Sequence, residues 1–111
     1  MIDVKPMKIT DTKTGEEFTL EFDKESVRFA EQRGFDLDDV QRFPLSKTEE
    51  LFWYAFRMHH KRVDLIRARK LLEGIGELPE DFIERLMMLY AKPYEAFAER
   101  ADDETPFVTV E

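Results

Sequence analysis

Cysteine is absent from this chain of 111 residues, and its absence removes several kinds of chemistry at once. Without a thiol there is no disulfide, no thiolate nucleophile and no cysteine-based zinc site. Long apolar runs are missing as well: no stretch approaches the roughly 20 residues that cross a bilayer, and the N-terminus lacks the apolar core of a signal peptide. These absences predict a soluble, cytoplasmic protein.

Positive charge is also scarce. Lys and Arg number 17 against 25 Asp and Glu, which gives a formal net charge of −8. Binding to phosphate backbones or to anionic lipid depends on Lys and Arg that displace counterions, so we expect neither nucleic acid nor membrane as a partner. The hydrophobic fraction of 42% is nevertheless high enough to offset the entropy of the chain, and we expect the chain to fold.

The length fits a single domain, which we place at residues 1–101. Residues 102–111 are predicted to form an acidic linker and a short strand-like tail. Near the N-terminus, apolar and polar residues alternate in two runs, which predicts a β-hairpin over residues 6–22 with Gly15 ending its turn. The predicted fold class is therefore α+β and predominantly α-helical, with the hairpin packed on a small bundle of about four helices.

Helix start signals occur at three points after the hairpin. Asp23 and Asp64 are placed to cap helices over residues 24–33 and 65–73. Ser46 and Glu49 have the spacing of a capping box, which predicts that the helix over residues 47–61 begins there.

Glycine and proline mark the predicted ends. Gly34 is placed to end the first helix, and the Gly74-Ile75-Gly76 segment ends the third. The last helix is predicted over residues 79–99, where Pro93 predicts a kink or a break near Tyr90.

The most unusual segment lies at residues 51–58, where six of the eight positions carry bulky apolar side chains. On a helical wheel Leu51 and Phe52 share one face, while Trp53 points nearly opposite. Met88 likewise falls on the polar side of the last helix. An apolar side chain on an outward face is either covered by another element or offered to a partner.

Catalytic and metal-binding patterns are weak. His59 and His60 are adjacent, so on a helix they point about 100° apart and cannot share a metal. Paired carboxylates lie at caps or in solvated runs, where acids are expected for local reasons. We therefore expect no enzymatic activity, no metal and no cofactor.

Four segments, taken in order, are similar to a known family. They are residues 21–35 (EFDKESVRFAEQRGF), 43–46 (FPLS), 50–60 (ELFWYAFRMHH) and 86–90 (LMMLY). In segment order and aromatic placement the chain resembles the small tail assembly chaperones of tailed bacteriophages and prophages, over roughly residues 7–98. The resemblance implies a non-enzymatic protein that binds the long helical tape-measure protein and keeps it soluble until tail tube subunits polymerise around it. Tail tube subunits are a second candidate partner.

A protein that holds an apolar helix needs a groove of aromatic and methionine side chains surrounded by charge. The side chains predicted to form this partner-binding groove are Trp53, Tyr54, Phe56, Arg57, Met87, Met88 and Tyr90. Trp53 is the first candidate because of its place on the wheel, and we expect Trp53→Ala to weaken binding while the fold stays intact.

One alternative function and the oligomeric state remain open at this point. An acidic interaction module or DNA mimic would use the negative charge to block a basic partner, although Lys and Arg are interspersed with the acids along every helix. Salt-sensitive binding to a basic partner would favour the mimic, and salt-tolerant binding to an apolar helix would favour the chaperone. Open hairpin edges and the strand-like segment at residues 107–110 also make homo-oligomers an expectation.

Overall fold

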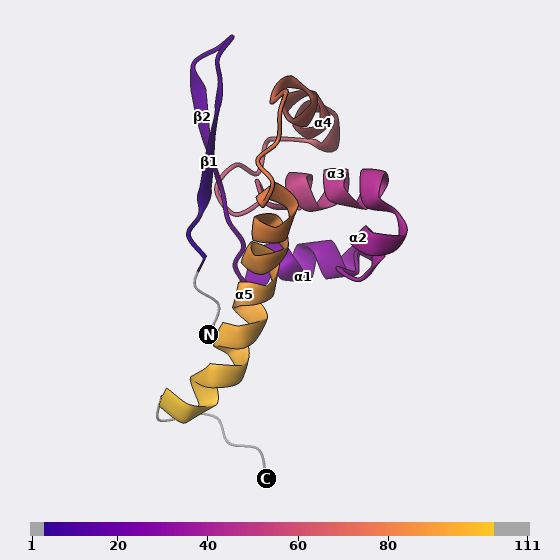
Figure 1. Ribbon diagram of the computed structural model, residues 1–111. Coiled ribbons are helices and arrows are strands. Elements are labelled where there is room, and N and C mark those ends of the chain that lie inside the picture. The colour runs from indigo at the N-terminus through magenta and orange to yellow at the C-terminus, as the bar shows by residue number, and fades with distance from the viewer. Residues whose placement is uncertain (1–3, 104–111) are drawn as a thin grey trace.

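An antiparallel hairpin followed by helices makes up the structure (Figure 1). The computed structural model describes the backbone of residues 4–103 and the side chains of residues 4–95. The strands are β1 (Met7–Asp11) and β2 (Glu16–Leu20), and the helices are α1 (Lys24–Gln32), α2 (Asp39–Arg42), α3 (Pro44–Tyr54), α4 (Leu65–Gly74) and α5 (Phe82–Asp103). The predicted α+β class, with a hairpin ahead of a helical bundle, is confirmed.

The hairpin forms where the alternation predicts it, within residues 6–22. Met7 pairs with Leu20 and Ile9 with Phe18, so these four side chains share one face of the ribbon. Gly15 has a φ of +79° and donates its N–H to the Asp11 carbonyl at 2.7 Å, which closes the turn. The shared face is buried against the helices, because a two-stranded ribbon is not stable alone.

Two of the predicted helix starts are confirmed by their hydrogen bonds. Asp23 Oδ1 accepts from the Ser26 N–H at 2.8 Å, and Ser26 Oγ accepts from the Asp23 N–H at 2.8 Å, a reciprocal cap on α1. Asp64 Oδ1 accepts from the Arg67 N–H at 2.8 Å and caps α4. Gly34, with a φ of +86°, follows the end of α1 as predicted.

The predicted start of the central helix is wrong. Pro44 occupies the first turn of α3 and Phe43 is its N-cap, so Ser46 lies inside the helix and makes no cap. Proline favours this position because its φ is already helical and its missing N–H would have no helical partner there.

The predicted end of that helix, at residue 61, is also wrong. Helix α3 ends at Tyr54, and the following residues form turns. The Ala55 carbonyl accepts the Glu21 N–H at 3.0 Å, so it bonds to the segment after β2 instead of to a further turn of helix.

Helix α5 runs from Phe82 to Asp103 without the predicted break. Pro93 lies inside the helix and is buried. Proline removes only one helical hydrogen bond, and the half of α5 before it is held by the buried side chains of Phe82, Leu86 and Leu89. The helix also extends past residue 99 into the predicted linker, and the rest of the predicted tail, residues 104–111, lies outside the described residues.

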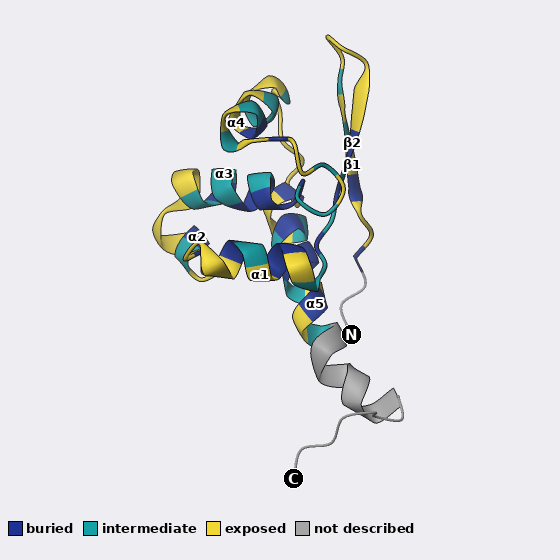
Figure 2. Ribbon diagram, turned by 180° about the vertical axis from the view of Figure 1, so that it is seen from behind, coloured by how far each residue is buried: buried dark blue, intermediate teal, exposed yellow. Residues whose placement is uncertain are grey.

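Aromatic rings form the centre of the core, where the hairpin base meets α1, α3 and α5 (Figure 2). Phe56 packs edge-to-face on Phe18 and Phe52, with centroids 5.4 and 5.1 Å apart. Tyr90 does the same with Phe22 and Phe35, at 5.1 and 5.4 Å. These ring contacts join elements that are far apart in the sequence.

Asp23 caps a helix and Ser46 does not, so replacing each by alanine should affect stability differently. Asp23→Ala removes the acceptor for an otherwise unpaired helix N–H and is expected to lower the free energy of unfolding by about 1 kcal/mol. Ser46→Ala, at an exposed position with no cap, is expected to change it by less than about 0.5 kcal/mol. Urea unfolding followed by circular dichroism measures both, and an equal loss in the two variants would contradict the assignment of the caps.

Candidate functional site

Three residues predicted to line an open groove are core residues. Tyr54, Phe56 and Tyr90 are 1%, 0% and 2% exposed. Burial raises the pKa of Tyr54 and of Tyr90, as expected for phenols removed from water. Their assignment to a partner-binding groove is therefore wrong in this structure. The wheel misplaced Phe56 because α3 ends at Tyr54 and the next turn carries the Phe56 ring back into the core.

Trp53 is half-buried and contacts its own chain. Its Nε1–H donates to the Val63 carbonyl at 2.9 Å, and its ring lies edge-to-face with Phe29 at 6.0 Å. The Arg33 guanidinium lies 5.1 Å from the indole centroid, and Arg57 lies 4.0 Å from the Phe29 centroid. This layer of two cations and two rings joins α1 to the end of α3. Trp53 therefore has a packing role, which argues against an unchanged fold in Trp53→Ala.

Met87 and Met88 are half-buried and pack against the core from α5. Neither these methionines nor Trp53 line the three pockets found on the described surface. The structure thus separates the predicted groove residues between core and surface instead of gathering them into one site.

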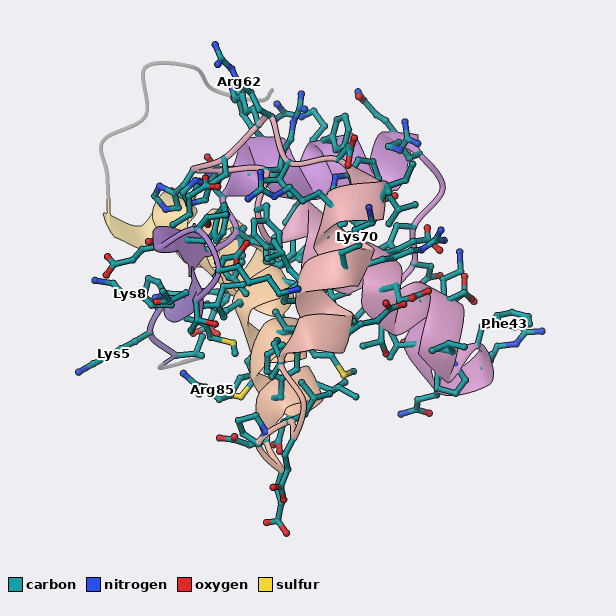
Figure 3. The ribbon with its side chains drawn as sticks, turned by 90° about the horizontal axis from the view of Figure 1, so that it is seen from above. Lys5, Lys8, Phe43, Arg62, Lys70 and Arg85 are labelled. Carbon is teal, nitrogen blue, oxygen red and sulfur yellow. The ribbon has the colours of Figure 1, made fainter. Side chains whose placement is uncertain are left out.

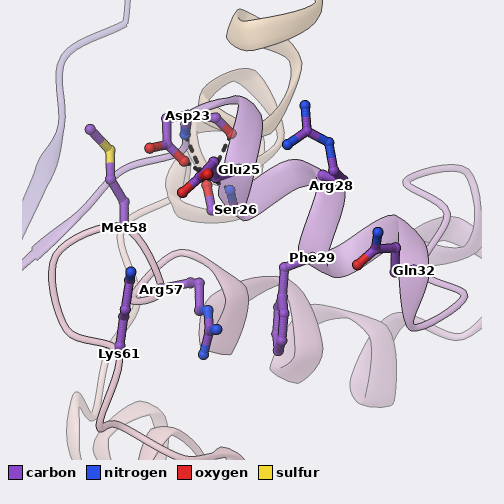
Figure 4. A pocket seen from close by; sticks show the side chains of 9 residues that line it. All are labelled: Asp23, Glu25, Ser26, Arg28, Phe29, Gln32, Arg57, Met58 and Lys61. Carbon is purple, nitrogen blue, oxygen red and sulfur yellow. Dashed lines mark hydrogen bonds between the residues drawn. The ribbon is translucent and has the colours of Figure 1, made fainter.

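A small pocket of about 250 Å³ lies beside the Arg57–Phe29 contact (Figure 4). Asp23 and Ser26 line it, and both are engaged in the α1 cap, drawn as dashed lines in the figure. Asp23 and Ser26 are therefore already engaged within the chain and are not free to hold a ligand in this pocket.

A large hollow lies between β1 and α4, which stand apart above the bundle in Figure 1. Its volume is about 950 Å³, and we call it the β1–α4 groove. The apolar side chains that line it include Met7, Ile9, Ile66, Leu71, Ile75 and Phe82. Ile66 is 64% exposed, so the groove offers apolar surface to solvent.

Arg67 holds the two walls of the groove together. Its guanidinium lies 2.6 Å from Glu16 Oε1 and 3.9 Å from Asp11 Oδ2, and it also packs over the Phe18 ring at 5.5 Å. These contacts connect α4 to both strands close to the hairpin turn. The spacing of the walls is therefore set by a charged pair and a ring contact rather than by a continuous apolar seam.

The groove carries unpaired positive charge in a chain that is acidic overall. Its carboxylates are engaged: Glu16 and Asp11 with Arg67, and Asp64 with the α4 N-terminus. Four further cations line it, and none has an ion-pair partner among the described residues: Lys8, Lys13, Lys70 and Arg85. Figure 3 labels three of them, which come from β1, α4 and α5. An acidic ligand would meet them at the rim.

The two histidines lie in the turns after α3 and hold the hairpin. His59 Nε2 lies 2.8 Å from Glu21 Oε1, and His60 Nε2 accepts the Thr19 N–H at 2.9 Å. Burial, with the nearby His59 as a second cause, lowers the pKa of His60 below its ordinary value. Over the described part of the chain, no group of three or more His, Asp or Glu could hold a metal ion, and no helix there is long and apolar enough to cross a membrane.

The fold and the groove together define a small hairpin-and-helix protein with an apolar hollow between its hairpin and α4. A family model described as "Domain of unknown function (DUF5055)" matches residues 1–109. The chain belongs to this family. No curated protein and no solved structure matched the chain.

The packing role of Trp53 predicts a loss of stability on truncation. Trp53→Ala removes the indole from the Arg33–Phe29 layer and leaves the Val63 carbonyl without its donor, so we expect a loss of about 2–3 kcal/mol in the free energy of unfolding. The exposed Phe43 supplies a control, since Phe43→Ala is expected to cost less than about 1 kcal/mol. Urea unfolding measures both, and wild-type stability in Trp53→Ala would refute the packing role.

The lowered pKa of His60 predicts acid sensitivity. Between that pKa and the ordinary value of about 6.5, the unfolded chain binds more protons than the folded chain, so stability rises with pH in this window. The contribution is complete above about pH 6.5 and is lost as the pH falls through the folded pKa. Unfolding curves between about pH 7.5 and 5 should show this loss.

Glutamine variants separate the two histidines. His60→Gln keeps an acceptor for Thr19 but does not titrate, so its acid loss should be smaller than that of the wild type. His59→Gln leaves the Thr19 acceptor and the burial of His60 in place, and burial is the larger cause of the lowered pKa, so this variant should keep most of the loss. If His59→Gln instead loses less stability in acid than His60→Gln does, a group other than His60 causes the acid sensitivity.

Proposed function

We propose that this chain is a non-enzymatic tail assembly chaperone that binds an apolar segment of a tape-measure protein in the β1–α4 groove. It would do so in the cytoplasm of the bacterial host, before tail tube subunits assemble. The proposal joins the resemblance of four ordered sequence segments to the apolar lining of the β1–α4 groove.

The observation that carries the proposal is the exposed apolar lining of the groove. Ile66 is exposed and Leu71 and Ile75 are half-buried, although α4 has a core to pack on. Contiguous apolar surface with a polar rim marks protein-interaction sites, because an isolated domain gains nothing by leaving it in water. A volume of about 950 Å³ is at the upper end of the roughly 300–1,000 Å³ of small-molecule sites, and its open, elongated walls suit a chain segment.

The shape of the binding site differs from the one expected from the sequence. The aromatic side chains of α3 hold the core, and the apolar surface offered to a partner comes from aliphatic residues of the hairpin and α4. Aliphatic walls from two separate elements can adapt to a range of apolar sequences, as a holding chaperone requires.

The alternative of an acidic DNA mimic receives less support. A mimic needs carboxylates gathered on an accessible face to meet a basic groove. In the β1–α4 groove the carboxylates are engaged and the unpaired groups are cations. Salt-sensitive binding to a basic partner would favour the mimic.

Two exposed apolar residues permit a matched test. Ile66 lines the groove, whereas Leu45, which is 78% exposed at the start of α3, does not. We expect Ile66→Asp to weaken binding to a tape-measure protein from the same phage or prophage by about tenfold or more, since a carboxylate must be desolvated in the groove. Leu45→Asp should bind as the wild type does.

Co-expression measures the effect directly. The tape-measure protein is produced alone, with the wild type and with each variant, and its soluble fraction and co-purification are compared. Failure of the wild type to keep it soluble would refute the function, and loss of binding in Leu45→Asp but not in Ile66→Asp would refute the site.

A further inference from the structure

We propose that the ligand of the β1–α4 groove is an extended acidic segment of a partner protein, which pairs with β1 as a third strand. The inference names the form and charge of the segment bound in the groove and so rests on the proposed function. Four features of the groove carry it: one covered sheet edge, one open sheet edge, an apolar floor and a basic rim.

The outer edge of β2 is covered by the chain itself. The Thr19 N–H donates to His60 Nε2 at 2.9 Å, and the Glu21 N–H donates to the Ala55 carbonyl at 3.0 Å. Both acceptors belong to the turns that follow α3. Near the base of the hairpin, this edge is therefore closed to a further strand.

The outer edge of β1 is open among the described residues. Along a strand, successive backbone N–H groups point to opposite edges. The Thr19 N–H points away from β1, so Lys8 and Thr19 form a pair without hydrogen bonds between them. The N–H groups of Lys8 and, two residues on, of Thr10 therefore point away from β2. The backbone N–H groups of Lys8 and Thr10 have no partner in the described part of the chain. These are the groups that an added strand requires.

The open edge borders the groove. The lining includes five consecutive β1 residues, Met7 to Asp11, whereas β2 contributes its Glu16 and no other residue. A lining of consecutive strand residues means that the backbone edge, and not one face alone, borders the hollow. An added strand would continue the face of Met7 and Ile9 and place alternate side chains toward Leu71, Ile75 and Phe82.

Charge identifies the occupant. The unpaired Lys8, Lys13, Lys70 and Arg85 line the groove. Acidic side chains on the outward positions of the added strand would lie on the same face as Lys8, and acidic side chains at the helical rim would meet Lys70 and Arg85. A second copy paired through β1 would instead bring two such basic rims together. The charges therefore favour an acidic partner over self-association at this edge.

The test uses a capped peptide of about eight residues in which valine and glutamate alternate, a length typical of one strand. We expect it to bind the full-length protein, with weaker binding as salt rises. A peptide of the same composition with its valines at helical spacing should bind at least about tenfold more weakly. Calorimetry gives both affinities.

Two proline variants at paired positions test the backbone contact. Thr10 and Glu17 are direct partners across the hairpin and both are exposed, but their N–H groups point to opposite edges. Thr10→Pro removes a donor from the open edge and is expected to weaken peptide binding about tenfold, while Glu17→Pro should bind as the wild type does. In hydrogen exchange by NMR, the peptide should protect the Lys8 and Thr10 amides and leave Glu17 unchanged.

A peptide with N-methylated amides on one edge makes the same test without altering the protein, in case Thr10→Pro does not fold. Loss of binding for one methylated edge supports strand addition. Equal binding of the alternating and helical peptides, unprotected Lys8 and Thr10 amides, or no binding of the alternating peptide overturns it. Dimerisation that Thr10→Pro abolishes would also overturn it, in favour of a second copy.

The outcomes separate this inference from the proposed function. If the tape-measure protein is kept soluble equally by the wild type and by Thr10→Pro, the chaperone function stands and strand addition falls. If the peptide binds as described but the tape-measure protein is not kept soluble, strand addition is supported and the tape-measure protein is refuted as the partner.

Discussion

Edge-to-face packing of aromatic rings is the interaction on which the rest of the structure depends. Phe56 joins α3 and its following turn to β2 through Phe18, and Tyr90 joins α5 to the segments around Phe22 and Phe35. A chain of 111 residues without cysteine has no covalent cross-link to hold a hairpin against helices. Rings provide large buried areas and preferred geometries, so a few of them can fix how these elements meet.

Because the rings hold the base of the hairpin, its outer half and α4 are left to form the groove. Arg67 spans the two walls near the turn, while the floor between them retains exposed aliphatic groups. The same arrangement explains why one sheet edge is closed and the other open. The turns after α3 bring His60 and the Ala55 carbonyl against β2, and nothing described reaches the outer edge of β1.

Local signals were sufficient where neighbouring residues decide the structure. Alternation predicted the hairpin, Gly15 ended its turn, and Asp23 and Asp64 capped their helices, because each depends on patterns, hydrogen bonds or φ angles within a few residues. The capping box at Ser46 failed since Pro44 supplies a stronger start two residues earlier. The break at Pro93 failed because the burial of α5 outweighs one missing hydrogen bond.

The sequence by itself determined the fold class, most element positions and the excess of aromatic side chains in the central segment. Only the tertiary structure decided where those side chains lie. A helical wheel assumes that the helix continues, and α3 ends at Tyr54 because the Ala55 carbonyl bonds to Glu21, a residue distant in sequence. The groove could not be predicted for the same reason. Ile9 and Ile66 come from segments with no unusual sequence pattern, and an apolar hollow forms between them only when both segments pack on a common core.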